Sequence, residues 1–334
     1  MKTFKALWIE KIDGVYTKSI AQRKIDSLPE GEVLIRVHYS SLNYKDALSS
    51  RGNKGVTRTY PHTPGIDAAG VVESSSSAVF EVGDEVIVTG YDLGMNTSGG
   101  LAEYIRVPAD WVVPKPKNLS LRDAMVFGTA GFTAAMSVDT LLQVGLAPSQ
   151  GAVLVTGATG GVGSVAVWLL ANLGFEVAAL TSRIDHSAWL YKLGAKEVVA
   201  AEHLLHPQQK PMLKPEWAGV VDCVGGEILS NALKSTQYGG SVTCCGMVQS
   251  AELNTSVFPF ILRGINLMGI DSVELPLQFK IDIWNQLADE WRFENFDVLE
   301  SELVQEIALD ASPNALETIL DNKHRGRFLV NCRA

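Results

Sequence analysis

The sequence predicts an α/β protein of two domains, in which a doubly wound parallel sheet is inserted into a β-rich domain. Three observations lead to this prediction. The chain has 334 residues, which is long for a single hydrophobic core. Roughly its first third is rich in strand and turn patterns, whereas strands and helices alternate through most of the remainder. Such alternation is typical of a parallel sheet with right-handed crossovers.

Composition narrows the class of protein. Hydrophobic residues make up 46% and charged residues 19%, which suits a packed enzyme rather than a disordered chain. A formal net charge of -9 disfavours nonspecific nucleic-acid binding. The four cysteines lack the spacings of a zinc site or a disulfide framework, which indicates a reducing compartment. We see no secretion signal and no membrane span, so we expect a cytoplasmic protein.

The first domain is expected to be built from short strands separated by glycine turns. The alternating or apolar runs are EVLIRVHYSSLN (32–43), GIDAAGVVESS (65–75) and GDEVIVTG (83–90). At the other end of the chain, 275–291 and 312–322 are expected to be helical and GRFLVNC (326–332) to be a strand. Because chain termini tend to lie close together, this closing strand is expected to return to the first domain.

The second domain begins with an Asn/Ser-initiated, alanine-rich helix at 118–145. The alternating elements that follow are strand–turn–helix 151–174, strand 175–182, helix 187–195, strand 197–201, strand 218–226, helix 227–236 and strands 239–246 and 265–271.

The turn TGATGGVGS (156–164) indicates a dinucleotide site. Ala158 occupies the first position of the pattern G-x-G-x-x-G, and Gly160 and Gly163 fill the other two. Gly160, Gly161 and the Val162 amide allow close approach to a pyrophosphate at the helix N-terminus. In a strand–turn–helix context this is strong evidence, although a plain tight turn is the alternative.

The next strand ends in Thr181, Ser182 and Arg183, where an NAD-binding protein would carry an acid. Ser182 can donate to a 2′-phosphate, and Arg183 can pair with it and stack on adenine. We therefore expect NADP as the cofactor. The alternative is that Arg183 is an ordinary solvated side chain.

These motifs resemble the medium-chain dehydrogenase/reductase superfamily along the whole chain. The matching segments, in family order, are SSLNYKD, PGIDAAGVV, VGDEV, GGLAEY, GTAGFTA, TGATGGVGS, DCVGG and GRFLV. PFILRGINLMGIDSVELP (259–276) resembles the zinc-free acrylyl-CoA reductase branch, once catalogued with quinone oxidoreductases. The resemblance implies a GroES-like catalytic domain at 1–123 and 273–334, an inserted Rossmann domain at 124–272, and a homodimer formed through a strand near 265–271.

The zinc ligands of metal-dependent relatives are missing from this sequence. SSLNYKD holds no cysteine, and the His-Glu dipeptide is replaced by Ile66-Asp67. His62 and Asp67 alone do not make a closed site, so we predict no metal and interpret His62 as structural. Without a Lewis acid, we expect conjugate reduction of an activated alkene rather than alcohol oxidation.

The expected catalytic cluster is LNYKDALSSRG (42–52). By resemblance, Asn43 contacts the nicotinamide ribose or the substrate carbonyl. Tyr44 is a candidate donor or proton relay, with an ordinary half-buried tyrosine as the alternative. Asp46 is expected to orient its neighbours, and Arg51 to meet an anionic part of the substrate.

The resemblance also implies contacts with the cofactor outside the glycine-rich turn. They come from Thr129 and Thr133, from Gly246, Met247, Ile270 and Asp271 beside the nicotinamide, and from Arg327 near the pyrophosphate. Arg263 is a pocket residue without an assigned role. A coenzyme A thioester would also need cations, for which Lys45, Arg51, Lys54 and Arg58 are candidates.

The expected function is NADPH-dependent reduction of a short 2-enoyl-CoA, with acryloyl-CoA to propanoyl-CoA as the first choice. One alternative is a broader quinone or enone oxidoreductase. The other is a non-catalytic, NADPH-binding protein like the lens crystallins.

Overall fold

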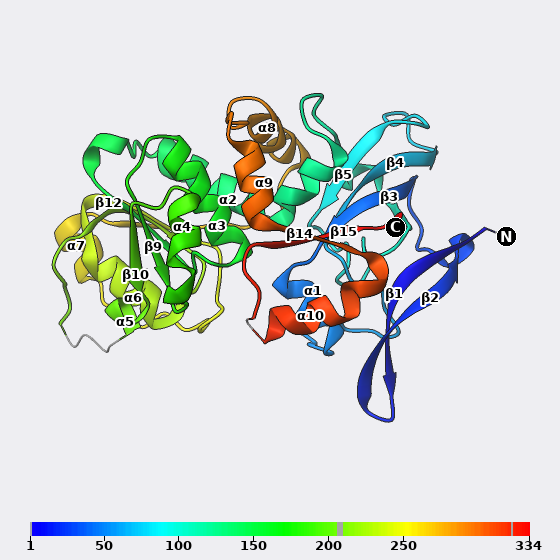
Figure 1. The fold of residues 1–334 in the computed structure, drawn as a ribbon, viewed down its shortest axis with the longest axis horizontal. Helices are drawn as coiled ribbons and strands as arrows, with labels where there is room; N and C mark the ends of the chain where they lie inside the picture. The colour runs from blue at the N-terminus through cyan, green and yellow to red at the C-terminus, as the bar shows by residue number, and fades with distance from the viewer. Residues whose placement is uncertain (1, 206–209, 322) are drawn as a thin grey trace. The chain divides into compact units, whose positions relative to one another are not determined.

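A computed structural model describes residues 2–205, 210–321 and 323–334 (Figure 1). The chain divides into two compact units. Unit 1 comprises Met1–Thr129, Ser272–Arg292 and Val304–Ala334; unit 2 comprises Ala130–Asp271 and Phe293–Leu303.

Unit 1 is built mainly on antiparallel strands. β1 (Thr3–Ile12) and β2 (Val15–Lys24) form a two-stranded sheet. The larger, seven-stranded sheet has the order β14-β15-β3-β4-β5-β7, and β6 also pairs with β3. Its strands are β3 (Val33–Ser41), β4 (Asp67–Ser75), β5 (Glu85–Thr89), β6 (Tyr104–Val107), β7 (Val112–Pro114), β14 (Val304–Ala308) and β15 (Arg327–Asn331). Strands were expected in each of the sequence runs that became β3, β4 and β5.

The closing strand β15 pairs antiparallel with β3 and parallel with β14 (Figure 1). The prediction that the end of the chain returns to the first domain is therefore confirmed. Residues from β3, β4, β5 and β15 bury their apolar side chains in one core with Leu316 and Ile319 of α10 (Ser312–Leu320). The spacing of those two residues places them on one face of the helix. Asn322, at the end of the expected helix, lies outside the described residues.

The other helices of unit 1 are α1 (Tyr44–Ser50) and α8 (Leu277–Ala288). In α8, Ile283, Trp284 and Leu287 are buried at helical spacing, as the sequence pattern predicts. Short 3₁₀ turns lie at Ile25–Ser27, Ala109–Trp111 and Leu309–Ala311.

Unit 2 contains a six-stranded sheet of order β10-β9-β8-β11-β12-β13, whose strand pairs are all parallel. Numbered from β8, this is the order 3-2-1-4-5-6 of a dinucleotide-binding fold, with its switch point between β8 and β11. The strands are β8 (Val153–Thr156), β9 (Val177–Thr181), β10 (Glu197–Ala200), β11 (Trp217–Asp222), β12 (Thr236–Cys244) and β13 (Asn266–Gly269).

The helices of unit 2 alternate with these strands. They are α3 (Gly161–Asn172), α4 (Ser187–Lys192), α5 (Glu202–Leu205), α6 (Gly226–Ser235) and α7 (Phe258–Arg263), with 3₁₀ turns at Pro148–Gln150 and Ile184–His186. Ile228, Leu229 and Ala232 of α6 pack in one core with Leu154 and Val220 of the sheet. The predicted doubly wound α/β architecture is confirmed.

Helix α2 (Leu121–Gln143) is interrupted by a kink. Gly128 has φ 52 and ψ -161, which is non-helical, so the helix is kinked there. By length and composition α2 is apolar enough to cross a membrane, but 78% of its most apolar stretch is buried within the protein. We therefore interpret it as a core helix.

The structure differs from the expected domain limits at 293–303, which the sequence placed in the first domain. Helix α9 (Phe296–Leu303) belongs to unit 2. The rings of Phe293 and Phe296 pack edge-on against Trp168, and Trp189 Nε1 donates to the carbonyl of Glu302 at 2.8 Å. Aromatic packing with distant residues places segment 293–303 in unit 2. Such long-range packing cannot be recognised from a local sequence pattern.

Candidate active site

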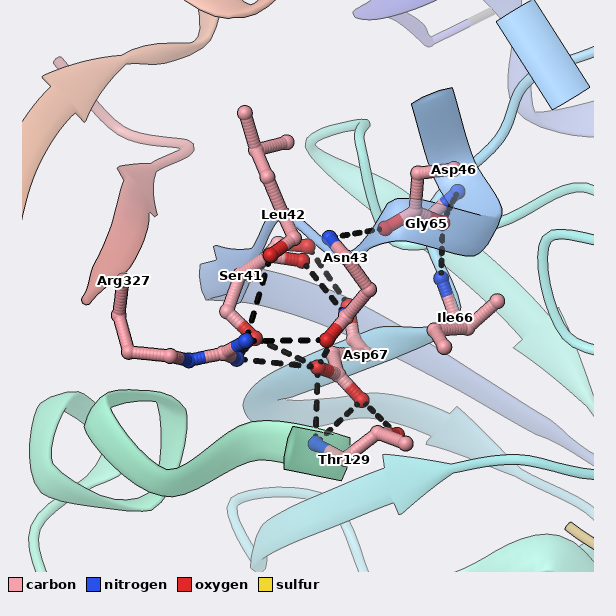
Figure 2. A network of polar contacts seen from close by, with 10 residues as sticks. Ser41, Leu42, Asn43, Asp46, Gly65, Ile66, Asp67, Thr129 and Arg327 are labelled. Atoms are coloured by element: carbon pink, nitrogen blue, oxygen red, sulfur yellow. Dashed lines mark hydrogen bonds and ion pairs between the residues drawn. The ribbon is translucent and has the colours of Figure 1, made fainter. Parts of the chain in front are cut away.

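A buried polar network in unit 1 brings together four segments that are far apart in the sequence (Figure 2). Asn43 lies two residues after the end of β3, Asp67 begins β4, Thr129 follows the kink in α2, and Arg327 begins β15. Asp67 is fully buried at the centre. A buried carboxylate must be satisfied by donors, and the four segments provide them.

Asp67 accepts from Thr129 through both the backbone N–H, at 3.0 and 2.9 Å, and the hydroxyl. It also accepts from the Ser41 hydroxyl and, at 2.7 Å, from Asn43 Nδ2. Gly128 makes this packing possible. A Cβ at that position would lie 2.3 Å from Ser41 Oγ, 2.5 Å from Arg327 Nη2 and 2.6 Å from Asp67 Oδ2.

Arg327 is buried, and its guanidinium is held by protein atoms. Nη1 donates to Asn43 Oδ1 at 3.0 Å and to the Leu42 carbonyl at 3.3 Å, while Nη2 donates to Ser41 Oγ at 2.7 Å. Nη2 also lies 3.7 Å from Asp67 Oδ2. Burial lowers the pKa of Arg327, and Asp67 and Asp46 oppose that shift. The expected contact of Arg327 with a pyrophosphate stays a prediction.

Asp46 is buried in the first turn of α1. Its carboxyl accepts from the backbone N–H groups of Asn43 at 2.8 Å, Gly65 at 3.1 Å and Ile66 at 3.0 Å (Figure 2). Burial, together with the charge of Asp67, raises the pKa of Asp46 to about 7, although hydrogen bonds from Asn43 and Ile66 oppose the shift. The contacts tie the start of α1 to the loop before β4, which suits the orienting role expected for Asp46.

The remaining polar residues of this loop are more exposed. Tyr44 is 46% exposed. Arg51 forms an ion pair with Glu317, and Lys54 Nζ donates to the Arg58 carbonyl at 2.6 Å. Lys45 Nζ lies 3.9 Å from Met95 Sδ. The ion pair means that Arg51 would have to exchange Glu317 for an anionic substrate group.

The glycine-rich turn in unit 2 follows β8 at the switch point of the sheet. A Cβ on Gly163 would lie 2.4 Å from the Gly157 carbonyl, so the helix packs too closely on the turn for any other residue. Helix α3 has 12 residues, and its N-cap residue is Gly160, so no side chain at that position caps the helix N-terminus. Across the switch point, Thr156 Oγ1 donates to Asp222 Oδ1 at 2.7 Å. This geometry fits a dinucleotide pyrophosphate.

The tip of β9 places a cation beside that turn. Arg183 donates to Thr159 Oγ1 from Nε at 3.1 Å and from Nη2 at 2.6 Å. Its own N–H donates to Thr181 Oγ1 at 3.0 Å, and Ser182 is exposed. The guanidinium is therefore held against the glycine-rich turn, which suits a 2′-phosphate and argues against a freely solvated side chain.

Other expected cofactor residues of unit 2 lie at the carboxyl ends of its strands. Gly246 and Met247 follow β12, and Ile270 and Asp271 follow β13, whereas Thr133 is buried in α2. Arg263 binds the carbonyls of Lys234, Thr236 and Leu213, which anchors α7. Contacts of any of these residues with a cofactor stay predictions.

Within the described residues, no three His, Cys, Asp or Glu side chains are grouped so that they could hold a metal. His62 is buried, and its Nε2 is 2.9 Å from the Gly94 carbonyl. Burial lowers the pKa of His62, in keeping with a structural role. All four cysteines are free.

Sequence reasoning missed the central role of Asp67 and the contribution of Ser41. The local sequence presents Asp67 only as a candidate metal ligand and Arg327 as a candidate phosphate contact. No local pattern links residues 41, 67 and 327, because their proximity depends on the order of the strands.

Comparison with protein families matches residues 29–117 to the alcohol dehydrogenase GroES-like domain and residues 161–289 to the zinc-binding dehydrogenase domain. The Bacillus subtilis protein YhfP, which carries a provisional quinone oxidoreductase name, is 45% identical over 98% of both chains. This chain belongs to the medium-chain dehydrogenase/reductase family. The acrylyl-CoA reductase AcuI of Ruegeria pomeroyi is 42% identical to this chain, and the alignment covers 99% of this chain and 100% of the AcuI chain.

Solved structures of the family agree with this assignment. The Salmonella enterica YhdH oxidoreductase in complex with NADP has a TM-score of 0.95 at 41% identity, covering 98% of this chain and 100% of its own. YhfP with NAD bound also has a TM-score of 0.95, at 44% identity, covering 99% and 100%. The expected fold and family are confirmed, and the NADP complex supports the expected cofactor.

Proposed function

We propose that this protein reduces the carbon–carbon double bond of a short 2-enoyl-CoA with NADPH. The first-choice reaction converts acryloyl-CoA, NADPH and a proton to propanoyl-CoA and NADP⁺. The observation that carries the proposal is the 42% identity to AcuI over nearly the full length of both chains. A second candidate, reduction of quinones or simple enones, is favoured by the similar identity to YhfP.

The cofactor is NADP, held in this proposal by residues of unit 2. The amides of the glycine-rich turn at the N-terminus of α3 bind the pyrophosphate. Arg183 and the exposed Ser182 bind the 2′-phosphate. When bound, the cofactor supplies hydride to the β-carbon of the alkene.

The chain's own residues orient the reactants and handle the proton. A carbonyl conjugated to the alkene gains negative charge as hydride adds, so a donor aimed at its oxygen stabilises the transition state. Tyr44 is the proposed donor or relay, because a phenol can both donate and accept. Thr133, Gly246, Met247, Ile270 and Asp271 are proposed to line the nicotinamide site, and Arg51 to meet an anionic part of the substrate.

The proposal includes a cytoplasmic homodimer. β13 is the last strand of its sheet, and Phe258, Ile261 and Leu262 of α7 are exposed. A second copy that pairs edge to edge with β13 would cover part of this apolar surface. Light scattering of the purified protein tests this: a monomer mass at micromolar concentration would contradict it.

The deciding experiment compares acryloyl-CoA, crotonyl-CoA and a benzoquinone at matched concentrations, with oxidation of NADPH followed by absorbance. We expect kcat/KM for acryloyl-CoA to exceed that for the quinone at least about a hundredfold, or roughly 2.7 kcal/mol of discrimination. Equal or faster quinone turnover would favour the second candidate. Tight NADPH binding without turnover of any acceptor would contradict both.

The variant Tyr44→Phe tests the proposed donor. We expect kcat to fall about a hundredfold or more with the Kd for NADPH unchanged. An unchanged kcat would show that the proton arrives by another route.

A further inference from the structure

Two thiols lie against each other at the carboxyl edge of the sheet of unit 2. The Cys245 thiol donates to Cys223 Sγ at 3.9 Å, across a separation of 22 residues. Both side chains are partly buried, and both cysteines are free. Cys223 directly follows β11, and Cys245 directly follows the neighbouring strand β12. The reduction proposed above uses neither thiol.

The backbone already has the spacing that a bond between these thiols requires. In the parallel pair β11 and β12, Asp222 lies opposite Cys244, and the next residue on each side is a cysteine. The Cys245 N–H donates to the Asp222 carbonyl at 3.0 Å, which continues the ladder past the end of β12. Neighbouring strands are about 4.8 Å apart, and cysteines are bridged at Cα separations of about 4.4–6.8 Å. Side-chain rotation is therefore sufficient to bring the two sulfur atoms together.

Close packing keeps the two strand ends together beyond the thiols. A Cβ on Gly246 would lie 2.0 Å from the Cys223 carbonyl oxygen, so a larger residue at position 246 would push the two segments apart. Farther along, the Gln249 N–H donates to the Val224 carbonyl at 2.9 Å. Backbone contacts thus lie on both sides of the thiol pair, and the pair does not depend on two mobile side chains meeting.

The thiol pair also contacts the glycine-rich turn, within the same unit. The Cys223 N–H donates to Thr156 Oγ1, at the end of β8, at 3.0 Å. A Cβ on Gly157 would lie 3.6 Å from Cys223 Cβ and 3.0 Å from Val224 Cγ2, so the turn packs directly against this segment. A movement of Cys223 toward β12 would therefore change the support of the turn.

We propose that Cys223 and Cys245 form a redox-sensitive modification site, whose reversible disulfide weakens binding of a dinucleotide at the glycine-rich turn. The oxidant belongs to the hydroperoxide class, and low-molecular-weight thiols reverse the reaction. In a cytoplasmic protein such a disulfide is transient and forms under oxidation. The effect on the dinucleotide rests on the cofactor site of the proposed function, whereas formation of the disulfide does not.

The reaction with hydrogen peroxide proceeds in two balanced steps. One thiolate attacks a peroxide oxygen, the O–O bond breaks, and a sulfenic acid forms while the displaced hydroxide leaves as water with the proton of that thiol. The other sulfur then attacks the sulfenic sulfur; the S–S bond forms, the S–O bond breaks, and a second water leaves with the second thiol proton. The hydrogen bond with Cys245 and burial raise the pKa of Cys223, so alkaline pH favours the reactive thiolate.

The first test maps the disulfide in the full-length protein. Hydrogen peroxide is added at about pH 8.5, remaining thiols are alkylated in urea, and peptides are sequenced by mass spectrometry. We expect a peptide in which Cys223 is linked to Cys245, with Cys244 and Cys332 alkylated, and recovery of four thiols with dithiothreitol. Cys244→Ser is the matched control and should keep the link, whereas Cys245→Ser should lose it. A link through Cys244, or no link at all, would overturn the proposal.

The second test measures the effect on the turn. The probe is 2′-phospho-ADP-ribose, which carries the phosphates of NADP without the nicotinamide, titrated by calorimetry after the peroxide is removed. Oxidation should raise its Kd about tenfold in wild type and in Cys244→Ser, and dithiothreitol should reverse the change. Cys245→Ser treated in the same way should stay within about twofold on the same reasoning. Equal Kd values for the oxidised and reduced protein would overturn the coupling to the turn.

These outcomes are distinguishable from failure of the proposed function. If the protein binds NADPH but does not reduce acryloyl-CoA, the substrate assignment fails, and both tests still decide the inference. If the reduced protein binds neither NADPH nor the probe, the cofactor site of the proposed function and the coupling fail together. The peptide map then still decides whether Cys223 and Cys245 form the disulfide.

Discussion

Arg327 donates from Nη1 to Oδ1 of Asn43 at 3.0 Å, across a separation of 284 residues. The two ends of the chain meet here because β15 pairs with β3. Arg327, the first residue of β15, is thus placed beside Asn43, two residues after the end of β3. The candidate site depends on this pairing, and the predictions below test its parts.

Replacing Gly128 with Ala should destabilise unit 1 strongly. A Cβ there would lie within 2.6 Å of Ser41, Arg327 and Asp67, and φ is 52. We expect a loss of about 3 kcal/mol or more in the free energy of unfolding, measured with urea. The control Gly145→Ala has a similarly positive φ of 90 but open space, and should lose only about 1–2 kcal/mol. Equal losses would mean that the close approach is unimportant.

Asp46 should make stability depend on pH. Its pKa is raised in the folded state to about 7, from an ordinary value of 3.8. The folded state then binds more protons than the unfolded state between these values, so stability falls as pH rises from about 4 to 7. Relative to Asp46→Asn, we expect wild type to lose up to about 4 kcal/mol across this window. Urea unfolding of both proteins from about pH 4 to 8 measures it, and parallel curves would contradict the raised pKa.

The variant Arg183→Ala should discriminate between cofactors. Removing the guanidinium from the tip of β9 should raise the Kd for NADPH about 10- to 100-fold, as expected for loss of a charge-assisted hydrogen bond. The Kd for NADH should change less than about threefold on the same reasoning. Lys192→Ala is the control, since Lys192 pairs with Glu302 on the surface of unit 2. An equal loss of affinity for both cofactors would contradict the proposed contact of Arg183 with the 2′-phosphate.

Cys332 should be the slowest cysteine to react. It is 2% exposed, and burial raises its pKa to about 12. Only about one thiol in ten thousand would then be ionised at about pH 8, and the thiolate is the reactive form. Alkylation followed by mass spectrometry should label Cys332 in native protein last, and all four cysteines rapidly in urea. Early labelling of Cys332 in the native state would contradict its burial.

Much of the fold could be predicted from local patterns. The glycine-rich turn between β8 and α3 has the spacing of a dinucleotide-binding strand–turn–helix unit, and the alternation after it implies a parallel sheet. The strand at 326–332 was recognisable by its apolar run. The segment 293–303 was not assignable, because its place in unit 2 depends on aromatic contacts with Trp168.

The candidate site divides in the same way. Arg183 could be located from the sequence, since the residue that contacts the adenosine ribose lies at a characteristic distance after the glycine-rich turn. Asn43 and Asp46 could be chosen as candidates, but the direction in which the Asn43 amide points could not. That direction depends on Asp67 and Arg327, which come from strands brought together only by the sheet.

The sequence by itself determined most of the alternating strands and helices of unit 2 and several strands of unit 1, together with the residue types at the glycine-rich turn and at the tip of β9, because these follow from side-chain periodicity and short-range spacing. The tertiary structure decided which buried charges face each other and so which hydrogen bonds remain open. A buried amide takes its orientation from the donors and acceptors around it, and in this protein those are contributed by residues 67 and 327, from distant strands.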